Sequence, residues 1–314
     1  MALPPRFRQR DHAGIPDGAS YVRRMRRLIR VLLVLGVILV VLWTWGACNA
    51  RADPIVRQTR INLPDWPTGA PPVRVALISD IHIGNGAMDG ARLSRIVAQI
   101  NALKPDIVLI AGDFVYGHDP VAARDYARAL IAPLSALRAP LGVVATLGNH
   151  DEWTSPAAID AALAQAHVTV LHNEVIAKGP LAIAGVGDAY SGHADPYATG
   201  AALNHLHGAR IALSHSPDLA RHLPPSIGLF FAGHTHCGQV VLPFIGPISE
   251  VAMNRYLCGV VHDGTRTTIV TGGLGTSGVP LRFGAPPDLW LVKLGPKIST
   301  TRIELASKML AVPG

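Results

Sequence analysis

Five groups of acidic, amide and imidazole side chains each follow a short apolar run. They comprise Asp80 with His82, then Asp113, then Asn149 with His150 and Asp151, then His215, and finally His234 with His236. Residues two apart on an extended chain point to the same side, so the carboxylate and imidazole of an Asp-x-His pair face one point. Oxygen and nitrogen donors suit Mn, Fe or Zn and disfavour a closed thiolate site. The residue types therefore predict a metal centre.

Two divalent ions held by such residues would hydrolyse a phosphate ester. Cations about 3.5–4 Å apart lower the pKa of a bridging water and neutralise the phosphate oxygens during in-line attack. No protein nucleophile is needed, and the sequence contains no G-x-S-x-G motif. A single Asp-x-His or His-x-His pair is more often a surface pair than a ligand pair. Five groups in this order, each behind an apolar run, favour the metal centre.

Apolar runs and helical periodicity alternate through the part of the chain that carries these groups. Strands are predicted at 73–78, 107–111, 143–147, 181–185, 210–213 and 229–232, and helices at 91–103 and from Ser155-Pro156 onward. The alternation predicts an α/β domain whose helices lie outside the sheet. Every polar group then lies at the carboxyl end of a strand, where open α/β sheets build their sites.

Further β structure is predicted on both sides of this alternation. Residues 56–63 lie in a proline-rich stretch that excludes a helix, and they are predicted to form an edge strand. After residue 237, segments punctuated by Gly and Pro at 239–243, 267–271 and 289–294 show little helical signal. They predict a second, more antiparallel sheet.

The order D-x-H, G-D, G-N-H-D, H and G-H-x-H resembles the calcineurin-like metallophosphoesterase superfamily over about residues 56–295. The resemblance implies a sandwich of two mixed β-sheets flanked by helices. It assigns Asp80, His82 and His236 to one divalent ion and Asn149, His215 and His234 to a second, with Asp113 bridging both. His150 would contact the phosphate and protonate the leaving oxygen after attack by the bridging hydroxide. Asp151 would orient His150.

The chain also resembles a narrower branch of this superfamily, at residues 233–239, Pro243, Gly246, Tyr256, 272–275 and 280–282. That branch contains membrane-associated bacterial phosphodiesterases such as UDP-2,3-diacylglucosamine hydrolases, which implies a lipid-linked phosphodiester or pyrophosphate substrate. Arg282 has two interpretations, a ligand for a second phosphate or a salt-bridge partner. A nuclease or nucleotide phosphodiesterase is the alternative enzyme. A non-catalytic scaffold is the alternative from another class, and the presence of His150 disfavours it.

The N-terminal region predicts a membrane anchor. Residues 31–48 contain no charge and are long enough to span a bilayer as a helix. Arginines precede this run, and Trp43 and Trp45 lie at its far end, which predicts a cytoplasmic N-terminus and a catalytic domain outside the cytoplasm. A cleaved signal peptide, with Ala50-Arg51-Ala52 as its processing site, is the alternative. UDP-linked lipid precursors are cytoplasmic, so this topology conflicts with that substrate.

The predicted organisation is a basic cytoplasmic tail at 1–30, an anchor at 31–48, a tether at 49–55, a catalytic domain at 56–300 and a tail at 301–314. The net charge is +7, but residues 1–30 contain eight arginines against two aspartates and carry +6 of it. The nearly neutral remainder argues against a nucleic-acid partner. The oligomeric state is not indicated.

The three cysteines form no C-x-x-C pair, which argues against a thiolate zinc site and a disulfide framework. Cys237 and Cys258 are expected to be two buried thiols, although they could pair if the domain is exported. The nine histidines outside the motifs, among them His118, are expected on the surface or in loops.

Overall fold

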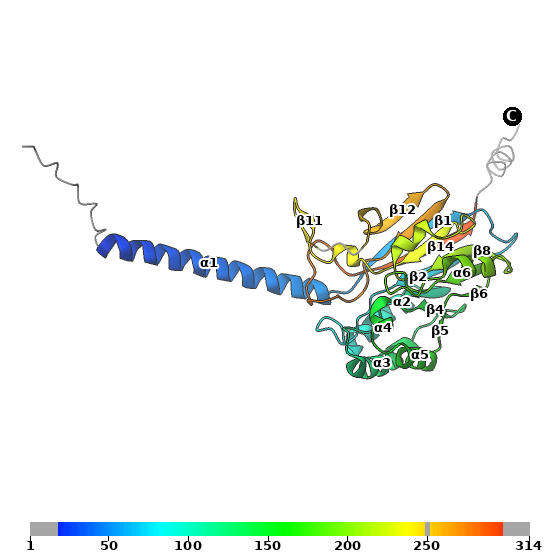
Figure 1. Cartoon of the computed structure of the whole chain (residues 1–314), viewed down its shortest axis with the longest axis horizontal. Helices are drawn as coiled ribbons and strands as arrows, with labels where there is room; N and C mark the ends of the chain where they lie inside the picture. The colour runs from blue at the N-terminus through cyan, green and yellow to red at the C-terminus, as the bar shows by residue number, and fades with distance from the viewer. Residues whose placement is uncertain (1–17, 249–251, 298–314) are drawn as a thin grey trace, which may run out of the picture. The chain divides into compact units, whose positions relative to one another are not determined.

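The computed structural model describes residues 18–248 and 252–297. The chain divides into two compact units, one ending at Trp45 and one beginning at Gly46. The first consists of most of helix α1 (Gly18–Arg51), drawn in blue in Figure 1. Within α1, Tyr21–Arg51 is long and apolar enough to cross a membrane. The helix runs three residues past the predicted end of the anchor at residue 48, and Ala50 is fully buried. The predicted tail at 301–314 lies outside the described residues.

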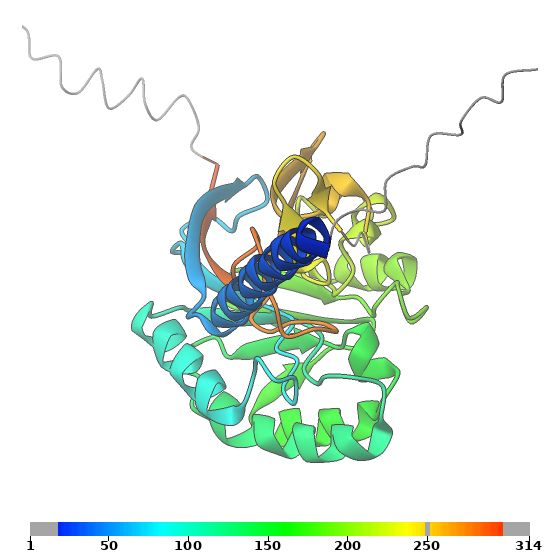
Figure 2. The same cartoon turned by 90° about the vertical axis from the view of Figure 1, so that its left-hand side faces the viewer.

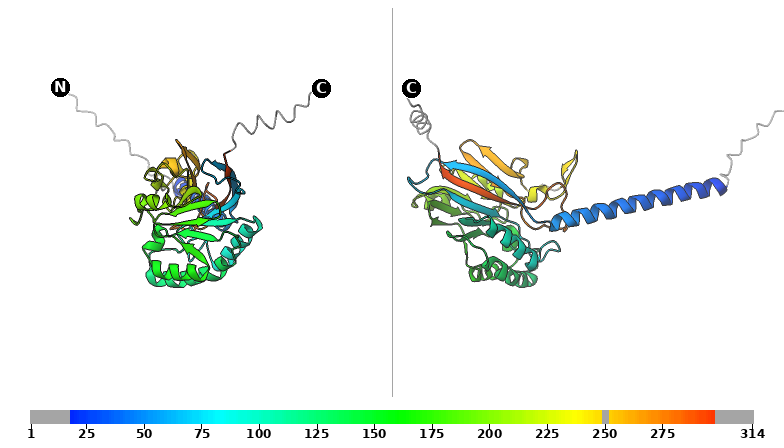
Figure 3. Two further views of the ribbon diagram at one scale, coloured as in Figure 1. Left: turned by 90° about the vertical axis from the view of Figure 1, so that its right-hand side faces the viewer. Right: turned by 180° about the vertical axis from the view of Figure 1, so that it is seen from behind.

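The second unit contains two six-stranded mixed sheets (Figure 3). The first has the order β1 (Ile55–Leu63), β14 (Asp288–Pro296), β2 (Val73–Ile78), β3 (Ile107–Ala111), β4 (Val143–Thr146), β5 (Val168–Val170). The second has the order β12 (Gly259–Asp263), β13 (Arg266–Val270), β9 (Leu229–Ala232), β8 (Ala209–Leu213), β7 (Leu181–Gly185), β6 (Glu174–Lys178). Strands β10 (Val241–Leu242) and β11 (Gly246–Pro247) form a separate hairpin.

Apolar side chains fill the space between the two sheets and under the helices. Leu77, Leu109 and Val144 of the first sheet pack in one cluster with Ile211 and Phe231 of the second. The other face of the first sheet is covered by α2 (Gly90–Ala102), α3 (Pro120–Ser135) and α5 (Pro156–Gln165), which Figure 2 shows along one side of the unit. The outer face of the second sheet packs on α6 (Pro196–Leu203) and the 3-10 helix η1 (Pro217–Arg221). The sandwich of mixed sheets flanked by helices agrees with the predicted fold class.

Short helical pieces complete the unit: α4 (Asn149–Glu152), η2 (His236–Gly238) and η3 (Asn254–Tyr256). The strands predicted at 73–78, 107–111, 181–185 and 229–232 have the predicted bounds. Strand β1 is an edge strand, as predicted, and it pairs in parallel with β14.

The segments after residue 237 contribute to a second sheet, as predicted, because β12 and β13 pair antiparallel there, but they do not form that sheet by themselves. Strand β13 joins the second sheet parallel to β9, and β14 enters the first sheet antiparallel to β2. These strands are largely buried, with all five residues from Asp288 to Val292 inaccessible or nearly so. An apolar run shows that a strand is buried but does not identify the strand beside it, so the pattern could not assign these strands to a sheet.

Candidate metal centre

The predicted ligands are brought together at the carboxyl ends of β2, β3, β4, β8 and β9. Five of them adopt left-handed backbone conformations, with φ between 47° and 72°: Asp80, His82, Asp113, His234 and His236. Such conformations are costly for residues with a Cβ, and they gather at functional sites. Hydrogen bonds between neighbouring strand ends hold them here, from Asp80 N to Gly112 O (2.9 Å) and from His82 N to Asp113 O (3.1 Å).

Glycines keep the space beside the carboxylates open. A Cβ on Gly148 would collide with the Asp113 carboxylate, and a Cβ on Gly233 would lie 2.6 Å from Asp80 Oδ2. A Cβ on Gly112 would lie 2.6 Å from the Gly148 nitrogen. The two strand ends that carry the acids can approach each other only with glycine at these positions.

Two groups of ligand atoms converge on either side of Asp113. In the first group, His236 Nε2 lies 3.2 Å from His82 Nε2 and 3.4 Å from Asp80 Oδ1. In the second group, His234 Nδ1 lies 3.1 Å from His215 Nε2. Asp113 Oδ2 lies 3.4 Å from His82 Nε2 and 3.1 Å from His215 Nε2, so one carboxylate oxygen faces both groups.

These distances and the unsatisfied oxygens fit two divalent ions. Two ligand atoms, each about 2.1 Å from one ion and 90–109° apart, lie about 3.0–3.4 Å from each other. Asp80 Oδ1 and Asn149 Oδ1 are buried without a hydrogen-bond partner, a costly state that a cation would relieve. The predicted ligands are therefore arranged as a pair of divalent metal ions would require, in agreement with their residue types.

Burial keeps two of the ligating imidazoles neutral, which is the form that binds metal. It lowers the pKa of His82 to about 3 and the pKa of His236 well below its usual value. Burial also lowers the pKa of His215, but the Asp113 carboxylate outweighs burial and raises that pKa well above its usual value. Burial raises the pKa of Asp80 to about 6. Cations would favour the ionised carboxylates and the neutral imidazoles together.

Backbone carbonyls orient the outer nitrogens of two ligands. His215 Nδ1 lies 2.7 Å from Ala111 O, and His82 Nδ1 lies 3.3 Å from Val115 O. With Nδ1 donating to a carbonyl, the lone pair of Nε2 points toward Asp113 and the ion sites. Such contacts fix both the tautomer and the ring orientation of a metal ligand.

His150, the second residue of helix α4, lies beside the two groups and lines the cavity. Its backbone N–H donates to Asp113 Oδ1 at 2.9 Å, which leaves Asp113 Oδ2 for the ion sites. Its ring Nδ1 lies 2.9 Å from Gly117 O, and Nε2 lies 3.4 Å from Ser277 Oγ. The ring meets the His82 ring edge-on, with centroids 5.0 Å apart. His150 also lies with His82 and Asp113 in a group that could hold an ion, so the geometry fits the predicted proton donor and a metal ligand alike.

The predicted orienting role of Asp151 is wrong. Its fully buried carboxylate accepts hydrogen bonds from the backbone N–H groups of Phe114, Val115 and Gly148, at 2.9, 3.2 and 2.9 Å. The Gly117 carbonyl takes the place beside the His150 ring that sequence reasoning gave to Asp151. Asp151 instead ties the start of α4 to the segment that follows Asp113.

A cavity of about 590 Å³ opens over the ligands. One wall is aromatic, because Trp153 stacks on His118 (centroids 5.3 Å apart) and Tyr190 lies against His234 (4.7 Å). Apolar side chains of Val240, Ile248 and Val279 line another part, with the Gln239 amide among them, and no lysine or arginine lines the cavity within the part of the chain that the structure describes. Sequence reasoning missed the aromatic wall and placed His118 among surface residues. The sequence signal for this wall was Trp153, which follows His150 by three residues and would lie beside it on a helical turn.

Arg282 lies away from the cavity, so the predicted phosphate contact is wrong. The side chain is fully buried and donates to the carbonyls of Gly272 (2.7 Å), Gly275 (2.6 Å) and Ala285 (3.0 Å). It also lies 3.2 Å from His236 Nδ1. Among the described residues its hydrogen-bond partners are carbonyls and an imidazole, and it forms no salt bridge to a carboxylate, which excludes the salt-bridge interpretation there. Arg282 joins the 272–275 loop to the turn that carries His236.

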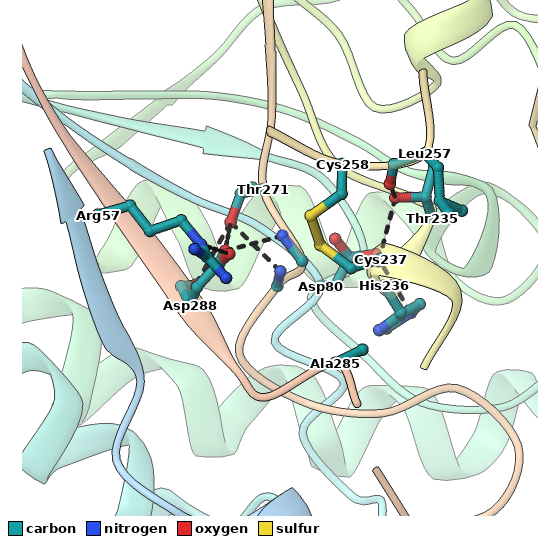
Figure 4. The surroundings of a disulfide bond; sticks show 12 residues. Arg57, Asp80, Thr235, His236, Cys237, Leu257, Cys258, Thr271, Ala285 and Asp288 are labelled. Carbon is teal, nitrogen blue, oxygen red and sulfur yellow. Dashed lines mark hydrogen bonds and ion pairs between the residues drawn. A yellow bond between two sulfur atoms is a disulfide. The ribbon is translucent and has the colours of Figure 1, made fainter. Parts of the chain in front are cut away.

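Cys237 and Cys258 form a disulfide, so the expectation of two free thiols is wrong (Figure 4). The bond joins the turn that follows His236 to the segment before β12. Thr235 Oγ1 donates to Leu257 O at 2.6 Å beside it, so two links hold the same pair of segments. Cysteine spacing does not reveal which sulfurs are neighbours in space.

Removing this disulfide is expected to destabilise the second unit. The two cysteines are 21 residues apart, and closing a loop of that length constrains the unfolded chain by about 3 kcal/mol. We expect Cys237→Ala with Cys258→Ala to lower the free energy of unfolding by that amount, as measured by urea unfolding followed by tryptophan fluorescence. Cys48→Ala, at an exposed free cysteine, is the matched control and should leave the midpoint unchanged. Equal unfolding midpoints for the unaltered chain, the double cysteine variant and the Cys48→Ala control would show that the disulfide contributes no stability.

Comparison with known proteins agrees with this site. The profile of the calcineurin-like phosphoesterase family matches residues 73–238, more than half of the chain. The chain is 31% identical to a transmembrane protein with metallophosphoesterase domain from Danio rerio, covering 81% of this chain and 60% of that protein. It is 31% identical to the uncharacterized metallophosphoesterase YkuE of Bacillus subtilis, covering 73% of this chain and 81% of YkuE.

A third relative has a named substrate. The chain is 26% identical to the UDP-2,3-diacylglucosamine pyrophosphatase LpxG of Chlamydia trachomatis, covering 81% of this chain and 93% of that enzyme. The chain spans 58–60% of the length of the animal relatives that it matches. The chain belongs to the calcineurin-like phosphoesterase family, as the order of its motifs predicts.

Proposed function

We propose that this protein is a membrane-anchored phosphoesterase with two divalent ions, of Mn, Fe or Zn, that hydrolyses phosphodiester or pyrophosphate bonds. The observation that carries the proposal is the position of Asp113 Oδ2, which lies within 3.4 Å of a histidine from each ligand group. Asp80, His82 and His236 would hold one ion, and Asn149, His215 and His234 the other. A single carboxylate oxygen between two converging groups is the arrangement that a pair of ions needs.

Residues of the chain would position the bridging carboxylate and supply the proton for the leaving oxygen. When bound, the two ions supply a hydroxide at neutral pH and neutralise the charge of the phosphate. The backbone N–H of His150 holds Asp113 in place, and the Gly117 carbonyl fixes the ring so that Nε2 faces the cavity. From there Nε2 would donate a proton to the leaving oxygen.

The cavity favours an amphipathic substrate. Its lining includes no lysine or arginine, so the phosphate charge would be balanced by the ions and the histidines. The aromatic wall of Trp153, Tyr190 and His118 suits a planar or sugar-like group, and the apolar residues suit a hydrocarbon chain. A lipid-linked nucleotide such as UDP-2,3-diacylglucosamine, the substrate class in the name of LpxG, combines these parts.

A substrate panel tests this assignment. The full chain in lipid nanodiscs would be offered UDP-2,3-diacylglucosamine, a lipid-linked diphosphate without a nucleotide, and soluble bis-(p-nitrophenyl) phosphate, with product analysis. We expect faster cleavage of both lipid-linked compounds than of the soluble ester. Preference for single-stranded DNA or a cyclic nucleotide over both lipids would instead favour the alternative nuclease or nucleotide phosphodiesterase.

We further propose that the second unit lies outside the cytoplasm. The arginines before the apolar run and the tryptophans at its end support this orientation, and so does the disulfide, because structural disulfides persist mainly in oxidising compartments. With this orientation, the substrate must be accessible to the catalytic domain from the outer leaflet of the membrane.

A reporter fusion tests the orientation. A C-terminal fusion to alkaline phosphatase, which folds only outside the cytoplasm, should be active, and a C-terminal fusion to green fluorescent protein should be dark. The opposite pattern would reverse the proposed topology. It would also make a cytoplasmic UDP-linked lipid directly accessible.

A further inference from the structure

The hairpin formed by β10 and β11, residues 241–248, exposes apolar side chains at its tip. Phe244 is fully exposed, Ile245 is 75% exposed and Ile248 is 63% exposed. Residues 240–249 contain no charged side chain. Adjacent exposed apolar side chains without a charge between them are costly in water and usually mark a surface that is covered. We call residues 241–248 the apolar hairpin.

A short series of contacts joins the apolar hairpin to the end of helix α1. The Gly46 carbonyl accepts a hydrogen bond from Arg282 N at 3.0 Å, and a Cβ on Gly46 would overlap the Phe283 ring. Phe283 N donates to Gln239 O, and Val241 N donates to Phe283 O, both at 2.9 Å. The first strand of the hairpin is therefore one strand spacing, about 5 Å, from the segment that packs on Gly46.

The position of Gly46 along the chain places this segment near a bilayer surface. The uncharged run at 31–48 ends two residues after Gly46, and Arg51 follows at the end of the helix. A spanning helix leaves the hydrocarbon region where its apolar run ends, and tryptophans such as Trp43 and Trp45 favour that boundary. The tip, three residues beyond Val241, lies within about 10 Å of Val241 along an extended chain and so within about 15 Å of Phe283.

We propose that the apolar hairpin inserts its tip into the bilayer interface. Phe244 and Ile245 would enter the boundary between headgroups and acyl chains, which removes their side chains from water. Figure 1 shows β11 projecting from the second unit. The bilayer is the occupant that the contacts favour, because they join the hairpin to Gly46, two residues before the uncharged run ends.

The hairpin also borders the cavity. Val240 and Ile248, on either side of the tip, both line the cavity above the metal ligands. An inserted hairpin would give the hydrocarbon part of a lipid-linked ester an apolar route from the bilayer to the ions. Insertion of the tip rests on the membrane anchor of the proposed function, and this second part also rests on the proposed activity.

Depth-dependent quenching tests the insertion without any activity assay. The full chain carrying Cys48→Ala and Phe244→Cys would be labelled with the fluorophore NBD without reductant, because Cys237 and Cys258 are paired. It would then be reconstituted in phosphatidylcholine vesicles containing phosphatidylglycerol and spin-labelled lipid. Val121→Cys, at a residue 71% exposed near the start of α3, is the matched control. We expect strong quenching and a blue shift at position 244 and neither at position 121. Quenching at 244 no greater than at 121 would overturn the proposal.

A second variant tests the route to the cavity. Phe244→Ser with Ile245→Ser should lower turnover of a lipid-linked ester in vesicles about fivefold and leave turnover of soluble bis-(p-nitrophenyl) phosphate unchanged. Phe244→Leu with Ile245→Leu should retain both activities. A fall on both substrates, or on neither, would overturn the route. Absence of activity in the unaltered chain would refute the proposed function, while the quenching result would still decide insertion.

Discussion

Asp113→Asn is expected to lower kcat for a phosphodiester by about 10²- to 10³-fold and to reduce bound metal from two ions per chain to one or none. The carboxylate lies between His82 and His215, at 3.4 and 3.1 Å, and asparagine presents neither its charge nor a second equivalent oxygen. Asparagine keeps an oxygen that can accept the His150 N–H, so the start of α4 should stay in place. The measurements are steady-state kinetics and metal analysis of the purified full chain.

Asp125→Asn is the matched control for this variant. Asp125 is exposed on α3, where it pairs only with Arg128 three residues later. It should keep its full metal content and activity. A chain with Asp113→Asn that loses activity while retaining two tightly bound ions would count against a bridging carboxylate, and full activity would remove Asp113 from the mechanism.

His150→Ala is expected to lower kcat by about 10²- to 10⁴-fold, the usual contribution of a general acid, without loss of metal. The side chain lines the cavity beside the predicted ligands, with the Gly117 carbonyl at Nδ1 and the Ser277 hydroxyl 3.4 Å from Nε2. A proton donor matters most for a poor leaving group. We therefore expect an alkyl phosphodiester to be affected much more than a p-nitrophenyl ester, whose leaving oxygen needs little protonation.

His205→Ala, at an exposed histidine after α6, is the control for loss of an imidazole. It should leave both substrates unaffected. An equal loss for the alkyl and the p-nitrophenyl ester in the His150→Ala chain would indicate phosphate binding rather than proton donation. Undiminished turnover of both would exclude either role.

Sequence predicted the features that depend on residue type and short spacing. The seven predicted ligands come together because each follows an apolar strand, and the carboxyl ends of β2, β3 and β4 in the first sheet meet those of β8 and β9 in the second. The bounds of β2, β3, β7 and β9 follow from continuous apolar runs, which are typical of buried strands. Family membership followed from the motif order.

Features that depend on contacts between residues distant in sequence could not be predicted from residue type and short spacing. Asp151 follows His150 in sequence, but its carboxylate accepts from the backbone N–H groups of Phe114 and Val115, which are distant in sequence, and from that of Gly148 at the start of its own turn. Arg282 looked available for a phosphate until its position among the carbonyls of 272–275 and Ala285 was known. The disulfide required the folded positions of Cys237 and Cys258, and the aromatic wall joins three separate segments.

Metal reconstitution tests the two-ion centre most directly. The full chain would be stripped with a chelator and titrated separately with Mn²⁺, Fe²⁺ and Zn²⁺, with bound metal and hydrolysis of bis-(p-nitrophenyl) phosphate measured at each step. With at least one of these metals, the arrangement of ligands around Asp113 predicts no turnover in the stripped chain and activity that rises until two ions are bound per chain. Full turnover in the metal-free chain, or a maximum reached with a single ion and no second site, would contradict it.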